Sequence, residues 1–96
     1  MMQQRQVAIV TGGADGFGAA IVDRFSQEGW HVIILDINQD KGELKASRNH
    51  YLLFLLGDVT RQETWERALT VAREKFGRLD VVVNNAGWFS YMLGVS

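Results

Sequence analysis

A glycine-rich segment near the start of the chain, Thr11-Gly12-Gly13-Ala14-Asp15-Gly16-Phe17-Gly18, has the residue types and spacing of an anion-binding loop. Gly12, Gly16 and Gly18 allow the backbone to turn tightly and to approach a ligand where a Cβ atom would clash. A helical pattern begins at the end of this segment, and the first N–H groups of a helix suit a diphosphate, as does the positive end of its dipole. The alternative is a glycine-rich turn that only lets a strand and a helix pack closely.

Asp36 is the second residue that could bind a ligand. It ends an apolar run 18 residues after Gly18, and an acidic side chain in that place can accept hydrogen bonds from the adenosine ribose of a dinucleotide. A lone aspartate after a strand is also a common turn former. Because the two features occur in this order, we interpret the loop and Asp36 as parts of one dinucleotide site.

The strands and helices that would position these residues can be predicted from hydrophobic periodicity and glycine breaks. Continuous apolar runs predict parallel strands, buried on both faces, at residues 6–10, 31–35, 51–56 and 79–83. Helices are predicted at residues 16–27, at residues 39–47 after an Asn38 cap, and from Thr60 to the stop signal Gly77. The single alternation of strand and helix predicts an α/β fold with three layers, α/β/α, around a parallel sheet.

The faces of the helices that meet the sheet follow from the same periodicity. In the first helix the recurring apolar residues are Phe17, Ala20, Ile21 and Phe25. In the third helix Thr60 and Glu63 have the capping-box spacing, and the recurring apolar residues are Trp65, Leu69, Ala72 and Phe76. Gly29 is placed to end the first helix in the left-handed conformation.

Four motifs, in order, resemble the short-chain dehydrogenase/reductase family. The segment from Thr11 to Gly18 has the form T-G-x-x-x-G-x-G, whereas G-x-G-x-x-G fails because Ile21 stands where the last glycine would be. Asp36 follows, and Asp58 stands where that family places an aspartate beside the adenine ring. Asn84-Asn85-Ala86-Gly87 matches the family's N-N-A-G. The resemblance covers residues 7–87 and implies a partial Rossmann fold with strand order 3-2-1-4, truncated after the fourth strand.

From these motifs we expect a cofactor site formed by Thr11, Gly12, Gly13, Asp15, Gly16, Phe17, Gly18, Asp36, Ile37, Asp58, Val59, Asn85, Ala86 and Gly87. We expect the cofactor to be NAD rather than NADP, because carboxylates at Asp15 and Asp36 would repel the 2′-phosphate of NADP. Asp15 as a solvent-facing turn residue is the alternative, so Asp36 carries this argument.

The hydride chemistry that the resemblance implies needs a Ser and a Tyr-x-x-x-Lys pair, in which the Tyr acts as acid and base. Tyr51 and Tyr91 are followed four residues later by Leu55 and Val95, so no catalytic residue is predicted. We expect residues 1–87 to form a partial NAD(P)-binding domain, followed by an apolar tail at residues 88–96. The chain would then be the N-terminal half of an oxidoreductase and would be inactive alone. The alternatives are a non-enzymatic or decoy module, which pairs with a full-length relative through the exposed edge of the fourth strand, and a truncated gene product.

The composition argues against several other classes of function. Ten Lys+Arg against eleven Asp+Glu give a net charge of −1 without a basic stripe, so no nucleic-acid or anionic-membrane partner is expected. Cysteine is absent and the two histidines are isolated, so no metal site is expected. A polar start and short apolar runs predict neither a signal peptide nor a membrane span, and we expect a cytoplasmic protein.

Overall fold

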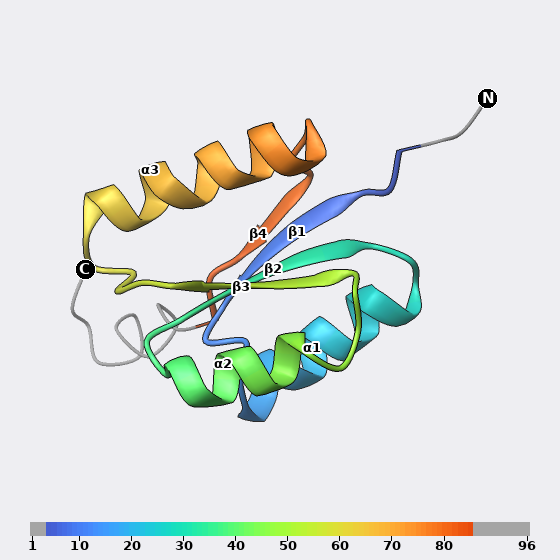
Figure 1. The fold of residues 1–96 in the computed structure, drawn as a ribbon, viewed down its shortest axis with the longest axis horizontal. Helices are drawn as coiled ribbons and strands as arrows, with labels where there is room; N and C mark the ends of the chain where they lie inside the picture. Colours follow the sequence, from blue (N-terminus) through green and yellow to red (C-terminus); the bar gives the residue numbers. More distant parts are fainter. Residues whose placement is uncertain (1–3, 86–96) are drawn as a thin grey trace.

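A parallel sheet with helices on both faces makes up the part of the chain that the computed structural model describes, residues 4–85. The elements are β1 (Val7–Thr11), α1 (Gly16–Gln27), β2 (His31–Asp36), α2 (Gln39–Ala46), β3 (Leu52–Leu56), α3 (Gln62–Val71), a π-helical turn η1 (Ala72–Phe76) and β4 (Val81–Val83). The strand order β3-β2-β1-β4 and the parallel pairing confirm the predicted three-layer fold. Helices α1 and α2 cover one face of the sheet and α3 covers the other (Figure 1).

The two central strands are buried on both faces, as their continuous apolar runs predicted. Alternate residues of β1 and β2 point to opposite sides, because side chains along a strand have a period of two. Ile9 and Ile33 pack with Ala68 under α3. Val10 and Ile34 pack on the other face, in the cluster that contains Val22 of α1. Burial of each such side chain stabilises the fold by about 1.5–3 kcal/mol.

Helix α1 has the predicted bounds, and Gly29 follows it with a left-handed φ of 87°. The predicted buried face is partly wrong, because Phe17 is 86% exposed while Val22 and Gly18 are buried. A Cβ atom on Gly18 would lie 1.9 Å from the carbonyl oxygen of Gly12. The helix therefore approaches the preceding loop through Gly18, which turns Phe17 away from the core.

Helix α2 begins at the predicted cap, since the Asn38 side chain accepts a hydrogen bond from the Lys41 N–H at 3.1 Å. It packs on β3 through Gly42, where a Cβ atom would lie 2.1 Å from the ring of Phe54. The expectation that the third strand is buried on both faces is wrong. As an edge strand, β3 is only half buried, and Leu56 is exposed.

The start of α3 differs from the predicted capping box. Thr60 donates to the Asp58 carboxylate through both its backbone N–H and its hydroxyl, and the helix begins at Gln62 without a side-chain cap. The buried residues of this helix are Thr64 and Ala68, one position before the predicted Trp65 and Leu69. Its last turn widens into the π-helical η1 before Gly77 ends it with a φ of 78°.

The fourth strand is shorter than predicted and lies at the edge of the described sheet. Its ladder with β1 runs from Val81 to Val83, and the Asp80 N–H donates to the Val7 carbonyl at 2.9 Å just before it. Val82 is 45% exposed. The predicted tail at residues 88–96 lies outside the described residues.

Candidate functional site

The predicted binding residues gather at the carboxyl edge of the sheet, because all four strands run in the same direction (Figure 1). Thr11 ends β1 and Asp36 ends β2. Asp58 follows β3, and Asn85 follows β4. Brought to one edge, these side chains surround the turn that joins β1 to α1. Ala86 and Gly87, which complete the predicted site, lie outside the described residues.

The glycines of this turn have different roles. Gly12 and Gly16 have φ values of 65° and 60°, in the left-handed region that favours glycine. A Cβ atom on Gly18 would collide with the Gly12 carbonyl, so Gly18 serves close packing. A Cβ atom on Gly16 would meet nothing within 4 Å, so Gly16 borders open space that a ligand can fill. Close packing is thus the role of Gly18, and the open space beside Gly16 leaves room for the ligand that the sequence predicts.

The first turn of α1 adds hydrogen-bond donors to that open space. Its first intrahelical bond runs from the Ala19 N–H to the Asp15 carbonyl at 3.2 Å. The N–H groups of Gly16, Phe17 and Gly18 precede it, where an α-helix has no acceptor of its own to offer. Such donors, at the positive end of a helix dipole, suit the oxygens of a diphosphate.

The turn is held from both neighbouring strands. The Gly12 N–H donates to the Leu35 carbonyl at 2.8 Å, and its carbonyl accepts from the Asn85 side chain at 3.5 Å. The Thr11 hydroxyl lies 3.1 Å from the Asn84 side-chain oxygen, to which it donates. Asn84 was not among the predicted site residues, although the N-N-A-G motif already placed it next to Asn85.

Asp36 holds the same turn with its carboxylate. One oxygen accepts from the Ala14 N–H at 3.1 Å and the other from the Asn38 N–H at 3.0 Å. The carboxylate is therefore fixed in position, and each of its oxygens keeps a further lone pair for a ligand hydroxyl. Both interpretations of Asp36, turn former and ligand binder, are compatible with this geometry. Ala14 was missed from the sequence because it contributes only its backbone.

A hollow of about 490 Å³ lies beside Asp36, lined by Ile37, Asn38, Gln39 and Asp40. Ile37 is exposed there, and Phe17 is exposed on the first turn of α1. Apolar side chains exposed beside polar binding groups suit the faces of flat rings, which are apolar while their edges carry polar atoms.

Asp58 has a structural role that the sequence did not reveal. Its carboxylate accepts from the N–H of Thr60 at 2.9 Å and from the hydroxyl at 2.7 Å. The hydroxyl contact, followed by the backbone contact, holds the pKa of Asp58 below its ordinary value. The next carbonyl, that of Val59, accepts from the indole of Trp65 at 2.9 Å. The turn after β3 is thus fixed, with the Asp58 carboxylate exposed.

Lys41 is a second residue that the sequence did not mark. Its ammonium lies 2.8 Å from the Asp15 carboxylate, across the gap between α2 and the glycine-rich turn. The hydrogen bond that Lys41 donates to the Asp15 carboxylate, followed by the charge of Asp15 and to a smaller extent that of Asp36, raises the pKa of Lys41. Asp15 occupies the N-cap position of α1 without capping it by its side chain. Asp15 is therefore a paired carboxylate, and its partner Lys41 lies 26 positions away in the sequence.

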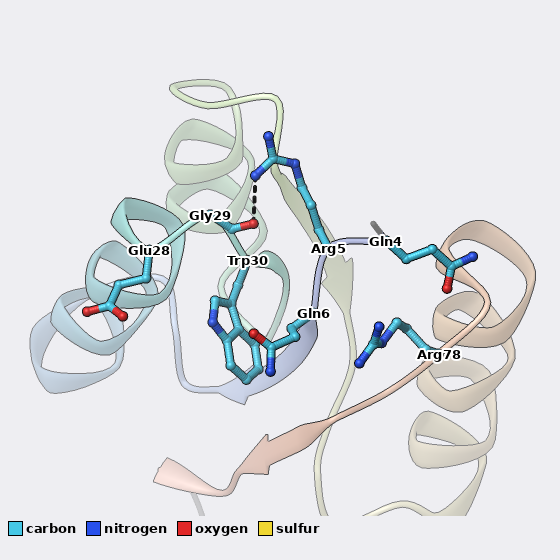
Figure 2. A pocket seen from close by; sticks show the side chains of 7 residues that line it. All are labelled: Gln4, Arg5, Gln6, Glu28, Gly29, Trp30 and Arg78. Carbon is cyan, nitrogen blue, oxygen red and sulfur yellow. Dashed lines mark hydrogen bonds between the residues drawn. The ribbon is translucent and has the colours of Figure 1, made fainter. Parts of the chain in front are cut away.

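A second hollow, of about 690 Å³, lies at the opposite edge of the sheet (Figure 2). Arg5 and Arg78 line it, but both guanidinium groups have partners. Arg5 donates to the Gly29 carbonyl at 2.8 Å and to the Tyr51 hydroxyl at 2.6 Å. Arg78 binds both carboxylate oxygens of Asp80. This hollow shares no residue with the predicted site.

Within residues 4–85, no group of three or more His, Asp or Glu side chains is placed to hold a metal ion. No helix in that range is long and apolar enough to cross a membrane.

Comparison with known proteins gives a family match over most of the chain. The family model described as "short chain dehydrogenase" matches residues 6–94. The chain is 44% identical over 82 residues to the 3-hydroxyacyl-CoA dehydrogenase type-2 of Bos taurus, covering 84% of this chain and 31% of that protein. It is 42% identical over 83 residues to the L-fucose dehydrogenase of Bos taurus, with 86% and 31% covered. The chain thus spans about a third of the length of these relatives.

Solved structures agree with the sequence match. The crystal structure of a 3-ketoacyl-(acyl-carrier-protein) reductase from Brucella melitensis, complexed with NADH, superposes with a TM-score of 0.78 at 29% identity. The match covers 82% of this chain and 33% of that one.

Proposed function

Because the chain belongs to the short-chain dehydrogenase family, we propose that it binds a nicotinamide adenine dinucleotide at the carboxyl edge of its sheet. One observation carries this proposal. The turn that would hold the diphosphate and the carboxylate that would hold the ribose are joined by the 3.1 Å hydrogen bond from Ala14 to Asp36. The two halves of the site are thereby kept in a fixed relation before any ligand arrives.

Each predicted residue has a role in this proposal. The first-turn N–H groups at Gly16, Phe17 and Gly18 bind the diphosphate, and Asp36 accepts from the ribose hydroxyls. The other members of the site support these two contacts or border the adenine and the second ribose; they are Thr11, Gly12, Gly13, Asp15, Ile37, Asp58, Val59, Asn85, Ala86 and Gly87. A bound dinucleotide would supply hydride transfer between its nicotinamide ring and an alcohol or carbonyl substrate.

We propose NAD as the preferred dinucleotide. The Asp36 carboxylate is held by two backbone N–H groups, so it cannot turn away from a phosphate on the ribose without losing both. A fixed negative charge beside a phosphate dianion opposes its binding. Asp15 adds less repulsion than its type suggests, because Lys41 is paired with it. The NADH complex of the Brucella melitensis reductase supports a nicotinamide cofactor in general.

For the chain as a whole, we propose the role of nucleotide-binding part of an oxidoreductase, without a catalytic residue of its own. The division into a binding domain at residues 1–87 and a tail at 88–96 belongs to this proposal, as does a cytoplasmic location.

The exposed Val82 on the edge strand β4 favours a second candidate, a non-enzymatic module that pairs with a full-length relative. Co-expression with such a relative and size-exclusion chromatography tests it: separate elution contradicts pairing, and NADH production by the chain alone contradicts the inactive role.

Calorimetric titration of the 96-residue chain with NAD and with ADP-ribose tests the binding proposal. We expect the wild-type chain to bind both, and Gly16→Val to abolish binding because its side chain would enter the open space at the turn. The matched control is Gly77→Val, which places the same side chain at a left-handed glycine remote from the site. It strains the backbone in the same way and should leave binding intact. No heat from the wild-type chain with either ligand, on folded protein, contradicts the proposal.

A further inference from the structure

Three basic side chains lie along α2 and the turn that follows it, on the side that meets α1. Lys41 and Lys45 are four residues apart, which places them on one side of the helix, and Arg48 follows in the turn just after α2 ends at Ala46. They border a groove of about 240 Å³ whose lining is Ala14, Ala19, Lys41, Leu44, Lys45 and Arg48. None of these three cations is a member of the proposed site, although the groove begins at the glycine-rich turn and Lys41 pairs with Asp15 of that turn.

The three cations differ in how firmly they are engaged. The Lys45 ammonium is paired with Asp23, and its side chain is only 14% exposed, so this pair fastens α2 to α1. The pair of Lys41 with Asp15 is open to solvent, with side chains 57% and 62% exposed. An exposed ion pair is worth little and opens readily. Within residues 4–85, the Arg48 guanidinium has no ion-pair partner. Lys41 and Arg48 are therefore the two cations of the groove that can bind an added anion.

Ala14 connects this groove with the proposed ribose site. Ala14 is one of the residues that line the groove, and its backbone N–H donates to the Asp36 carboxylate. The negative charge of Asp36 also interacts with the Lys41 ammonium and contributes to the raised pKa of Lys41. A phosphate carried by a ribose at Asp36 would therefore meet the Lys41 end of the groove.

We propose that Lys41 determines how the site treats a phosphate on the adenosine ribose, and that Asp15 controls Lys41 by pairing with it. When the pair is closed, the ammonium is engaged and Asp36 alone meets the ribose, which favours an unphosphorylated dinucleotide. When Asp15 cannot pair, Lys41 binds the 2′-phosphate and offsets Asp36. Asp15 thus acts by occupying a cation rather than by repelling the phosphate. This inference rests on the proposed dinucleotide function.

Four forms of the full chain test it, by calorimetric titration with NAD and NADP: wild type, Asp15→Asn, Lys41→Met and the double variant. The measured quantity is the ratio of the Kd for NADP to the Kd for NAD. We expect Asp15→Asn to lower this ratio about threefold to tenfold when Lys41 is present, and less than about twofold in the Lys41→Met background. Lys41→Met alone should raise the ratio, because the exposed pair opens part of the time and the wild-type ammonium then contacts the phosphate. Glu28→Gln, which breaks the exposed pair with Arg24 on the same α1, is the matched control and should leave it unchanged.

An equal effect of Asp15→Asn in both backgrounds overturns the inference, because it shows a charge effect through space without a contact from Lys41. If the wild-type chain binds neither dinucleotide, the proposed function fails separately. The inference is then decided with adenosine 2′,5′-bisphosphate and AMP, followed by the amide NMR signals of Ala14 and Lys41. Tighter binding of the bisphosphate alone in Asp15→Asn supports it, and identical binding of the two nucleotides overturns it.

Discussion

The backbone N–H of Ala14 lies 3.1 Å from the Oδ2 atom of Asp36, which joins the turn after β1 to the end of β2. The second oxygen of the same carboxylate accepts from Asn38, at the start of α2. One side chain therefore sets the relative position of two loops that would bind opposite ends of an ADP unit. Its charge and its geometry can be separated by substitution.

Asp36→Asn should weaken NAD binding about tenfold, since the amide keeps one acceptor oxygen but loses the charge and one of the two backbone contacts. The same change should reduce the preference for NAD over NADP, because the repulsion of a 2′-phosphate disappears. Calorimetric titration with both dinucleotides measures the two effects. Glu74→Gln, which removes an exposed acidic charge from η1 on the other face of the sheet, is the control. Equal losses in the two variants would contradict a specific role for Asp36.

Gly18→Ala should destabilise the fold far more than Gly16→Ala. The new methyl at position 18 would lie 1.9 Å from the Gly12 carbonyl oxygen, and overpacking of backbone against backbone costs about 3 kcal/mol or more. At position 16 the methyl meets open space, so only the left-handed backbone opposes it, at about 1–2 kcal/mol. Urea unfolding followed by circular dichroism measures the difference, and loss of a cooperative transition in Gly18→Ala agrees with it. Similar midpoints for the two variants would contradict the distinction drawn between the glycines.

Much of the fold could be predicted from the sequence because strand burial and helix ends depend on local signals. The continuous apolar runs of β1 and β2, the Asn38 cap and Gly29 are of this kind, and the structure confirms them. The buried faces of the helices were harder to predict, because they depend on how closely each helix approaches its neighbours in the folded chain. Phe17 fits the apolar period of α1, yet the close contact of Gly18 with Gly12 turns it outward.

The candidate site shows the same division. Its glycines and Asp36 could be predicted, because their residue types and their spacing along the chain are visible in the sequence. Lys41 and Asn84 contribute through contacts with Asp15 and Thr11, 26 and 73 positions away in sequence. Such pairs depend on which elements the fold places side by side. The capping box at Thr60 failed for a related reason, since Asp58 competes for its hydroxyl and its N–H.

Val82→Lys should reduce self-association of the chain. Val82 is exposed on β4, which pairs with β1 on one side and forms an edge of the described sheet. A charged side chain on an edge strand opposes pairing with another chain, because the partner would have to cover it. Sedimentation velocity should show a lower weight-average mass for the variant at equal concentration. Leu56→Lys, on the opposite edge strand β3, is the control, and an equal decrease there would contradict a special role of β4.

His31 should make the stability of the fold fall as the pH decreases below neutrality. Its ring stacks on Phe76 with centroids 4.4 Å apart, and its Nδ1 atom is buried without a hydrogen-bond partner among the described residues. Burial, and to a lesser extent the charge of Arg5, lowers the pKa of His31 from its ordinary value. A group of this kind binds its proton less readily in the folded state than in the unfolded state.

Above the ordinary pKa of about 6.5, His31 is neutral in both states and the free energy of unfolding does not depend on its titration. Below that value the unfolded chain takes up a proton that the folded chain refuses, so stability decreases until the pH reaches the lowered native pKa. Urea midpoints measured between about pH 8 and pH 5 should therefore fall in the wild type. His31→Phe retains an aromatic ring against Phe76 and should reduce the slope in that interval. A slope that survives unchanged in His31→Phe would assign the pH dependence to other groups.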